Sequence, residues 1–121
     1  MNKLTATILA IAILAAPSIA ADPWSAQDKA LEGVFIATMA MDYRQTSNIH
    51  TGPWHETNPI MGTHPAQASI NEYFLATTAL HAVVTGLLPD GKIRTAWQCA
   101  WNGVEIGTVE RNYKLGIRLN F

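Results

Sequence analysis

Three stretches of the sequence carry a narrow polar stripe on an otherwise apolar helix, and this pattern limits what the chain can fold into. The ranges 26–47, 68–88 and 93–112 are separated by segments rich in glycine, proline and asparagine, which end helices. With side chains about 100° apart around each helix axis, the polar residues of each range fall on one line. These residues are Thr38, Asp42, Gln45 and Thr46, then Thr77, Thr78, His81 and Thr85, then Gln98, Asn102, Glu105 and Asn112. We therefore predict an all-α chain, folded as a three-helix bundle with a short extended C-terminal tail.

The balance of polar and apolar residues favours helices whose polar stripes face one another. A surface helix of a soluble domain has the reverse pattern, with one apolar stripe and a broad polar face. Charged residues make up 14% of the chain, whereas soluble domains carry roughly 25%. Inward polar stripes and apolar outer faces are typical of helices that contact lipid. We expect a membrane-associated bundle, and a soluble periplasmic bundle is the alternative.

One segment is the best candidate for a transmembrane helix. Residues 73–89, YFLATTALHAVVTGLLP, contain no formally charged side chain and are just long enough to span a bilayer. The other two helices are weaker candidates because polar or charged residues interrupt them. Lys92 and Arg94 follow the turn at 89–91, and in a three-span topology both would lie on the outer side of the membrane, against the positive-inside rule.

The first twenty residues have the features of a secretory signal peptide. Lys3 precedes an apolar stretch at 4–16, and Ser18 and Ala20 place small residues at the −3 and −1 positions of a cleavage site. Cleavage would leave one helical domain, residues 21–121, and an uncleaved membrane anchor is the alternative. Export through such a signal places the chain in the bacterial cell envelope. The net charge of −1 gives no electrostatic footprint for nucleic acid.

Each predicted stripe contains one ionisable residue, and these are Asp42, His81 and Glu105. We call the candidate functional residues the polar seam. They are Asp42, Gln45, Thr46, His81, Gln98, Asn102, Glu105 and Asn112. Such residues hold helices together through hydrogen bonds inside a bundle, and we favour this role. If the ionisable residues converge, they could instead bind a divalent metal or transfer protons.

A second group lies in the segment HETNPIMG, residues 55–62, and consists of His55, Glu56 and Asn58. The histidines in and around this segment do not have the spacing of a zinc site. Asn58-Pro59 and Gly62 are typical of a turn. We expect a structured connection between the first two helices, with Glu56 as a fourth candidate metal ligand beside Asp42, His81 and Glu105.

The order and spacing of these motifs resemble a family of short, exported or membrane-associated proteobacterial and prophage proteins of uncharacterised function. The resemblance covers most of residues 21–121. It rests on D-Y-R-Q-T at 42–46, H-E-T-N-P-I-M-G at 55–62, Y-F at 73–74, His81, W-Q at 97–98, Glu105 and N-Y-K-L-G at 112–116. The family implies no activity. It implies that Asp42, Glu56, Asn58, His81, Glu105 and Asn112 belong to one recurring pattern.

These observations predict a small exported protein of the inner membrane with a structural or interaction role. Its partners would be the membrane together with another protein or further copies of the chain, and we do not expect an enzyme. The alternative is a metal-binding or hydrolytic membrane protein that uses a buried cluster of aspartate, histidine and glutamate.

Overall fold

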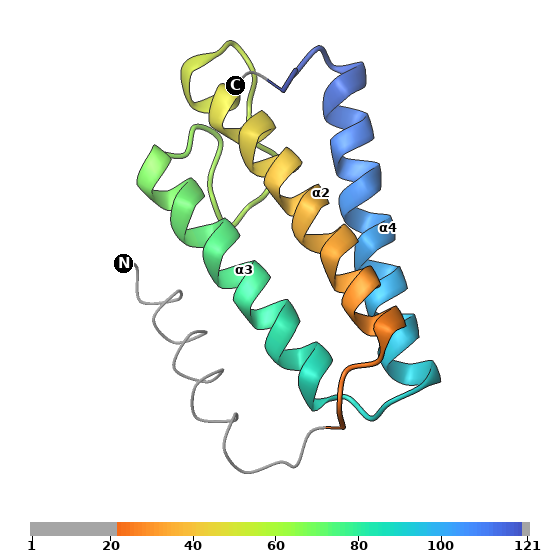
Figure 1. Cartoon of the computed structure of the whole chain (residues 1–121). Coiled ribbons are helices and arrows are strands. Elements are labelled where there is room, and N and C mark those ends of the chain that lie inside the picture. The colour runs from red at the N-terminus through yellow and green to blue at the C-terminus, as the bar shows by residue number, and fades with distance from the viewer. Residues whose placement is uncertain (1–21, 120–121) are drawn as a thin grey trace.

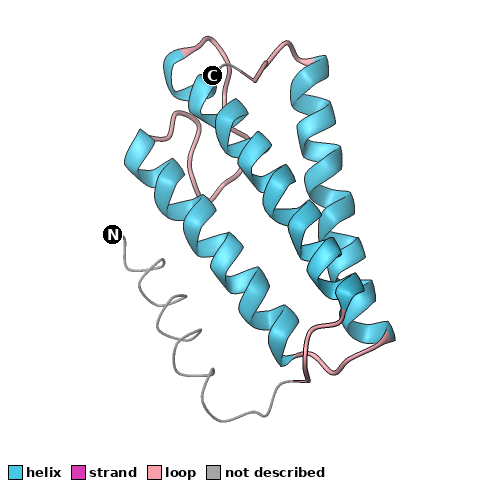
Figure 2. Cartoon of the chain, in the orientation of Figure 1, coloured by secondary structure: helices cyan, strands magenta, loops and turns pink. Residues whose placement is uncertain are grey.

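The computed structural model describes residues 22–119 as three α-helices, with no strand in that range (Figures 1 and 2). The helices are α2 (Ala26–Thr51), α3 (Gln67–Leu87) and α4 (Lys92–Lys114). For these described residues, the prediction of an all-α fold with three helices is confirmed. The predicted signal peptide, residues 1–20, lies outside the described residues.

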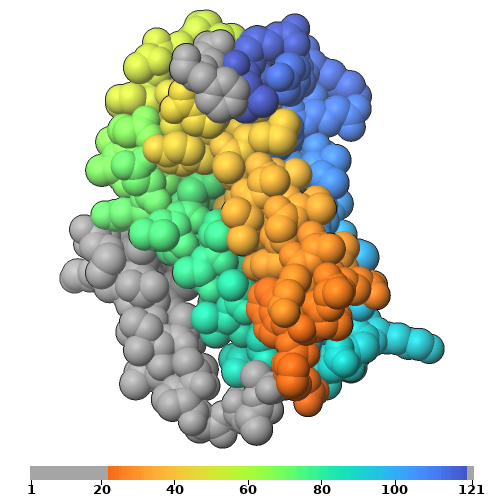
Figure 3. Space-filling model, in the orientation of Figure 1, coloured from red at the N-terminus to blue at the C-terminus, as the bar shows by residue number. Residues whose placement is uncertain are grey.

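α2 and α4 run in the same direction along the bundle, and α3 is antiparallel to both (Figure 1). α4 packs mainly against α2 and touches α3 much less. The space-filling view shows α2 at the front, between α3 on one side and α4 on the other (Figure 3). α2 is therefore the helix that holds the bundle together.

Local signals in the sequence explain where the helices begin and end. Ser25 caps α2: its Oγ accepts a hydrogen bond from the Asp28 backbone N–H at 3.1 Å, and its own N–H donates to Asp28 Oδ2 at 2.8 Å. Gly91, with φ of 98°, makes the turn into α4. After α4, Gly116 has φ of 86° and the Ile117 N–H donates to the Asn112 carbonyl at 3.0 Å. This hydrogen bond is typical of a Schellman motif, and it folds the chain back so that Ile117 is buried.

The interior of the bundle is mostly polar. A small apolar cluster of Phe35, Met39, Ile70 and Phe74 lies between α2 and α3. Many of the other buried side chains in residues 22–119 are polar or charged, and they are Asp28, Glu32, Asp42, Gln45, Thr46, His81, Thr85, Arg94, Gln98, Asn102, Glu105 and Asn112. Large apolar side chains are exposed instead, among them Val34, Ile36, Leu75, Ile93, Val104 and Ile106. This is the reverse of a conventional soluble core.

The polar stripes coincide with the packing seam between α2 and α4. Buried positions on both helices recur at intervals of three or four residues, which is the spacing of a coiled-coil seam. They are Asp28, Glu32, Phe35, Met39, Asp42, Gln45, Thr46 and Ile49 on α2, and Arg94, Gln98, Asn102, Glu105, Val109 and Asn112 on α4. Positions that are apolar in an ordinary coiled coil are thus largely polar here.

A buried ion pair closes the end of the bundle where α2 begins. Arg94 is 0% exposed, and its Nη1 lies 3.1 Å from Asp28 Oδ2. The same guanidinium donates to the carbonyls of Leu88, at 2.6 and 3.1 Å, and of Pro23 and Asp22. Burial raises the pKa of Asp28, but hydrogen bonds from Ser25 and Arg94 outweigh it and keep that pKa below its ordinary value.

In the sequence, Arg94 groups with Lys92 among the charges of the connection, but Arg94 is buried within α4, whereas Lys92 is exposed. Arg94 lies four residues before Gln98 and so falls on the seam. The carbonyls at the start of α2 and the end of α3 supply acceptors that a sequence pattern does not reveal.

The predicted transmembrane helix at 73–89 corresponds to most of α3. Among residues 22–119, the structure contains no helix with both the length and the apolar character needed to cross a membrane.

Replacing Arg94 by methionine should destabilise the protein strongly, because Asp28 would remain buried without its cation. Breaking such a pair costs about 3–5 kcal/mol of unfolding free energy, which urea unfolding at pH 7 would measure. Lys92→Met, at an exposed position two residues away, is the matched control and should change stability by less than about 0.5 kcal/mol. Equal stabilities of the two variants would show that the Asp28–Arg94 pair does not hold this end together.

Candidate functional site

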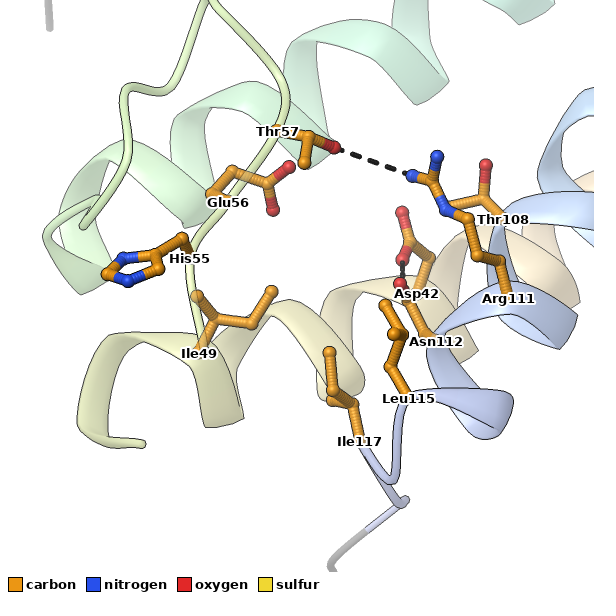
Figure 4. Close-up of a pocket in the computed structure, with 10 residues that line it drawn as sticks. All are labelled: Asp42, Ile49, His55, Glu56, Thr57, Thr108, Arg111, Asn112, Leu115 and Ile117. Atoms are coloured by element: carbon orange, nitrogen blue, oxygen red, sulfur yellow. Dashed lines mark hydrogen bonds between the residues drawn. The ribbon is translucent and has the colours of Figure 1, made fainter. Parts of the chain in front are cut away.

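The end of the bundle near the long connection contains a cavity of about 150 Å³, which we call the carboxylate cavity (Figure 4). α2, the connection between α2 and α3, α4 and the turn after α4 all contribute to its wall. It is lined by Asp42, Ile49, His55, Glu56, Thr57, Thr108, Arg111, Asn112, Leu115 and Ile117. The carboxylates of Asp42 and Glu56 extend from different elements into the same space (Figure 4).

A network of amide hydrogen bonds holds Asp42 in place. Asn112 Nδ2 donates to Asp42 Oδ1 at 2.9 Å and to Gln45 Oε1 at 3.2 Å. Gln45 Nε2 donates in turn to the carbonyls of Val109, at 3.2 Å, and Ile117, at 3.3 Å. The Asn112 amide thus bonds to two residues of α2, and the Gln45 amide bonds to α4 and to the turn after α4. The Asp42 carboxylate is thus fixed in direction as well as buried.

The segment HETNPIMG forms an ordered connection that positions Glu56. The Glu56 N–H donates to the Thr63 carbonyl at 2.9 Å, which closes the loop. Glu56 Oε1 accepts from the Asn58 N–H at 2.8 Å, and Asn58 Oδ1 accepts from the Ile60 N–H at 3.0 Å. Gly62 has φ of 79°, a conformation that favours glycine.

Burial and mutual repulsion shift the carboxyl groups at this end of the bundle. Burial, with a contribution from Glu56, raises the pKa of Asp42 to about 6. Burial and the nearby Asp42 raise the pKa of Glu105 to about 7. Burial also raises the pKa of Tyr73, and Glu105 and Asp42 add to that shift. Each of these two carboxyl groups therefore gains or loses its proton near neutral pH, which is the range in which acid–base groups work.

Arg111 and Glu105 also affect the charge around Asp42. Arg111 opposes the rise in the Asp42 pKa, and its Nη2 donates to Thr57 Oγ1 at 3.4 Å (Figure 4). Glu105 is 9% exposed, and its Oε2 is buried with no hydrogen-bond partner among the described residues. The cavity thus combines two carboxyl groups with one guanidinium. Glu105 is outside its lining, but it lies near enough to Asp42 for that carboxyl group to raise its pKa.

All eight residues of the polar seam are buried, but they form two groups. One group surrounds Asp42 and contains Asp42, Gln45, Thr46, Glu105 and Asn112, of which Asp42 and Asn112 line the carboxylate cavity. Further along the bundle lie His81, Gln98 and Asn102, which contact Glu32 and the first turns of α2.

His81 does not join the carboxyl groups of the cavity. Its Nδ1 lies 3.1 Å from Glu32 Oε1. Tyr73, whose pKa is raised by burial and then by Glu105 and Asp42, marks the height of those carboxyl groups on α3. It lies eight positions before His81, which is about 12 Å along the helix axis. The alternative in which Asp42, His81, Glu105 and Glu56 converge on a metal is not supported, because residues 22–119 contain no group of three or more histidine, cysteine, aspartate or glutamate side chains that could hold an ion.

The loop histidines also lie apart from the carboxyl groups. The rings of His55 and His64 contact each other edge to face, with centroids 4.6 Å apart. The His55 ring points away from Asp42 and Glu56 (Figure 4). His50 Nδ1 lies 3.0 Å from the Pro65 carbonyl oxygen. The histidines therefore support the shape of the connection rather than the chemistry of the cavity.

Sequence reasoning missed three buried charged residues, Asp28, Glu32 and Arg94. The signal that identifies them is the spacing of three or four residues, continued toward the start of α2 and of α4. Asp28 and Glu32 extend the line through Asp42, and Arg94 extends the line through Gln98.

Comparisons with protein-family models, curated proteins and solved structures found no match. The family resemblance inferred from the motifs stays a prediction.

The two raised carboxyl pKa values should make the protein less stable as the pH rises from about 4 to about 7. The folded state keeps protons on Asp42 and Glu105 in this range, where the unfolded chain has lost them. Asp42→Asn should therefore stabilise the protein at pH 8, by about 1–3 kcal/mol, and flatten the profile. Urea unfolding from pH 4 to pH 8 would measure both effects.

The control for this series is Glu110→Gln. Glu110 is exposed, and its ion pair with Lys114 lowers its pKa, so this change should not flatten the profile. Below pH 4 the trend should reverse, because protonating Asp28 removes the stability that its lowered pKa contributes. A wild-type stability that rises between pH 4 and pH 7 would contradict the assignment.

Proposed function

We propose that this protein is a small exported component of the bacterial cell envelope with a structural or interaction role, and that it lies against the inner membrane through an uncharged surface. In this proposal residues 1–20 act as the export signal and the helical bundle is the functional part. The observation that carries the proposal is the absence of exposed charge along the middle of all three described helices.

We call this surface the uncharged girdle and define it as the exposed side chains of residues 33–41, 75–87 and 93–108. The charged residues within these ranges, Arg94 and Glu105, are both buried. Large apolar side chains on the girdle are well exposed, up to 73% for Leu75. An apolar surface that extends over several helices is typical of a site that contacts lipid or protein.

Exposed charges are found at both ends of the girdle. Lys29 and Lys92 lie at the end where α2 and α4 begin, and Glu110, Arg111 and Lys114 lie at the other end. Charged groups beside an apolar band suit a protein whose middle contacts hydrocarbon and whose ends contact water. Further copies of the chain or another envelope protein could also cover part of the girdle.

Cell fractionation tests this proposal. Because the contact surface carries no charge, the protein should stay with the inner membrane after a wash in 1 M salt and be released by mild detergent. Leu75→Glu should shift protein out of the membrane fraction. Ser69→Glu, an exposed position on the same helix outside the girdle, is the matched control and should behave as the wild type. Recovery of the wild type in the fluid released by osmotic shock would contradict the proposal.

A second candidate function is hydrolysis by acid–base chemistry at the carboxylate cavity. The observation that favours it is that Asp42 and Glu56 line one cavity with Arg111 beside them. Protonated Asp42 would donate to a leaving group, Glu56 would accept a proton from water, and Arg111 would bind a developing negative charge.

A panel of chromogenic esters, phosphates and glycosides tests this second candidate. The turnover rate should fall as the pH rises through about 6, the pKa of Asp42. Asp42→Asn and Glu56→Gln should each lower the rate by roughly 100-fold or more, while Glu110→Gln should not. Hydrolysis that persists in Asp42→Asn would rule out this mechanism.

A further inference from the structure

The two carboxylates of the carboxylate cavity are not paired with basic side chains. Among residues 22–119, neither Asp42 nor Glu56 forms an ion pair. Asp42 is only 8% exposed, and its hydrogen bonds come from neutral groups, the Asn112 amide and the Thr46 hydroxyl. Buried charges in folded proteins are usually paired. These two carboxylates therefore favour the binding of a positively charged group.

Both carboxylates direct an oxygen into the cavity. One oxygen of Asp42 accepts the hydrogen bond from Asn112, and the other points away from Asn112 into the cavity (Figure 4). Glu56 Oε1 accepts from the Asn58 N–H, and no described residue donates to Glu56 Oε2. Burial, and then the negative charge of Glu56, raise the pKa of Asp42, so the two groups lie close enough to repel each other. A primary ammonium group, with its three donors, would bridge them and remove this repulsion.

Arg111 lines the same cavity but is turned toward the loop. Its Nη2 donates to Thr57 Oγ1 at 3.4 Å, which is long for a hydrogen bond, and no other described residue accepts from this guanidinium (Figure 4). A guanidinium has five donors in a planar fork that matches a carboxylate. The cavity thus offers a position for an anionic group beside the position for an ammonium group.

The rest of the cavity limits the size and polarity of a ligand. Ile49, Leu115 and Ile117 form an apolar part of the wall. The volume is about 150 Å³, and a cavity of that size holds roughly six non-hydrogen atoms, as in benzene. An organic cation fits better than a metal ion, because residues 22–119 contain no group of three or more side chains suited to hold a metal.

We propose that the carboxylate cavity binds a small α-amino acid with a short apolar side chain, of the size of alanine. Its ammonium group lies between Asp42 and Glu56, and its carboxylate faces Arg111. Its side chain contacts the apolar part of the wall. Each charged group of the cavity then meets an opposite charge, which neither a simple amine nor a simple carboxylic acid achieves. Binding requires neither turnover nor a membrane, so this inference rests on neither proposed function.

Alanine and two truncated analogues test the proposal. Propionate has the shape of alanine without its ammonium group, and ethylammonium lacks the carboxylate. In ¹H–¹⁵N NMR titrations of the purified protein at pH 8, at least one enantiomer of alanine should shift the backbone amides of Glu56 and Thr57 and the side-chain amide of Asn112. Each analogue should bind more weakly, by roughly tenfold or more, because one charged group of the cavity is left without its partner.

Three variants assign the contacts. Asp42→Asn should fold, since we expect it to stabilise the protein at pH 8, and it should weaken alanine binding by roughly tenfold or more. Glu110→Gln removes the same charge from an exposed side chain outside the cavity lining, and it should bind alanine as the wild type does. Arg111→Gln should bind alanine no better than ethylammonium, because the anionic group loses its partner.

The proposal is overturned if neither enantiomer of alanine binds, if either analogue binds as tightly as alanine, or if Asp42→Asn keeps the full affinity. Alanine binding without hydrolysis of any chromogenic substrate would support this inference and contradict only the second candidate function.

Discussion

The polar side chains between α2 and α4 must find partners inside the bundle, and the rest of the structure depends on this constraint. A buried donor or acceptor without a partner costs about 1–3 kcal/mol. Gln45, Gln98 and Asn112 each donate to two acceptors, which are backbone carbonyls or side-chain oxygens. Such directional bonds are satisfied only when the two helices meet at one height and one rotation. The seam therefore fixes the alignment of α2 and α4, a task that the shape of apolar side chains performs in most bundles.

The position of the apolar residues follows from the same arrangement. Because the seam is occupied by amides and carboxylates, apolar burial is concentrated in the cluster of Phe35, Met39, Ile70 and Phe74. This cluster joins α3 to α2 and leaves α3 only weakly attached to α4. Ile49, Val109 and Ile117 are also buried, whereas large apolar side chains along the middle of the helices, such as Leu75 and Val104, are exposed and belong to the girdle. Specific polar contacts thus define the fold, while the apolar surface is left available for contacts outside the chain.

The sequence predicted the helices and the inward direction of the polar stripes, because both depend on local features. Capping at Ser25, the turn at Gly91 and the periodicity around each axis are all visible in short windows. It did not predict which stripe residues meet. A stripe gives the direction of a side chain around its helix but not its height against a neighbouring helix. Asp42 and Glu105 lie close together, whereas His81 lies further along the bundle beside Glu32, and this difference in height separates one predicted cluster into two.

The contacts that define the fold have a consequence for how the chain reaches it. Asp28 pairs with Arg94 across 66 positions of sequence, and Asp42 pairs with Asn112 across 70. Helical bundles usually fold fast because most of their contacts are local. Here the specifying contacts form only after most of the chain has closed into one large loop, and the loss of chain entropy comes before those contacts can compensate for it. We therefore expect the pairing of α2 with α4 to be the slow step. Until then the ionisable groups of the seam remain in water, and Val109 and Ile117, which the folded chain buries, remain uncovered. The newly made chain therefore passes through a stage in which it is prone to aggregate.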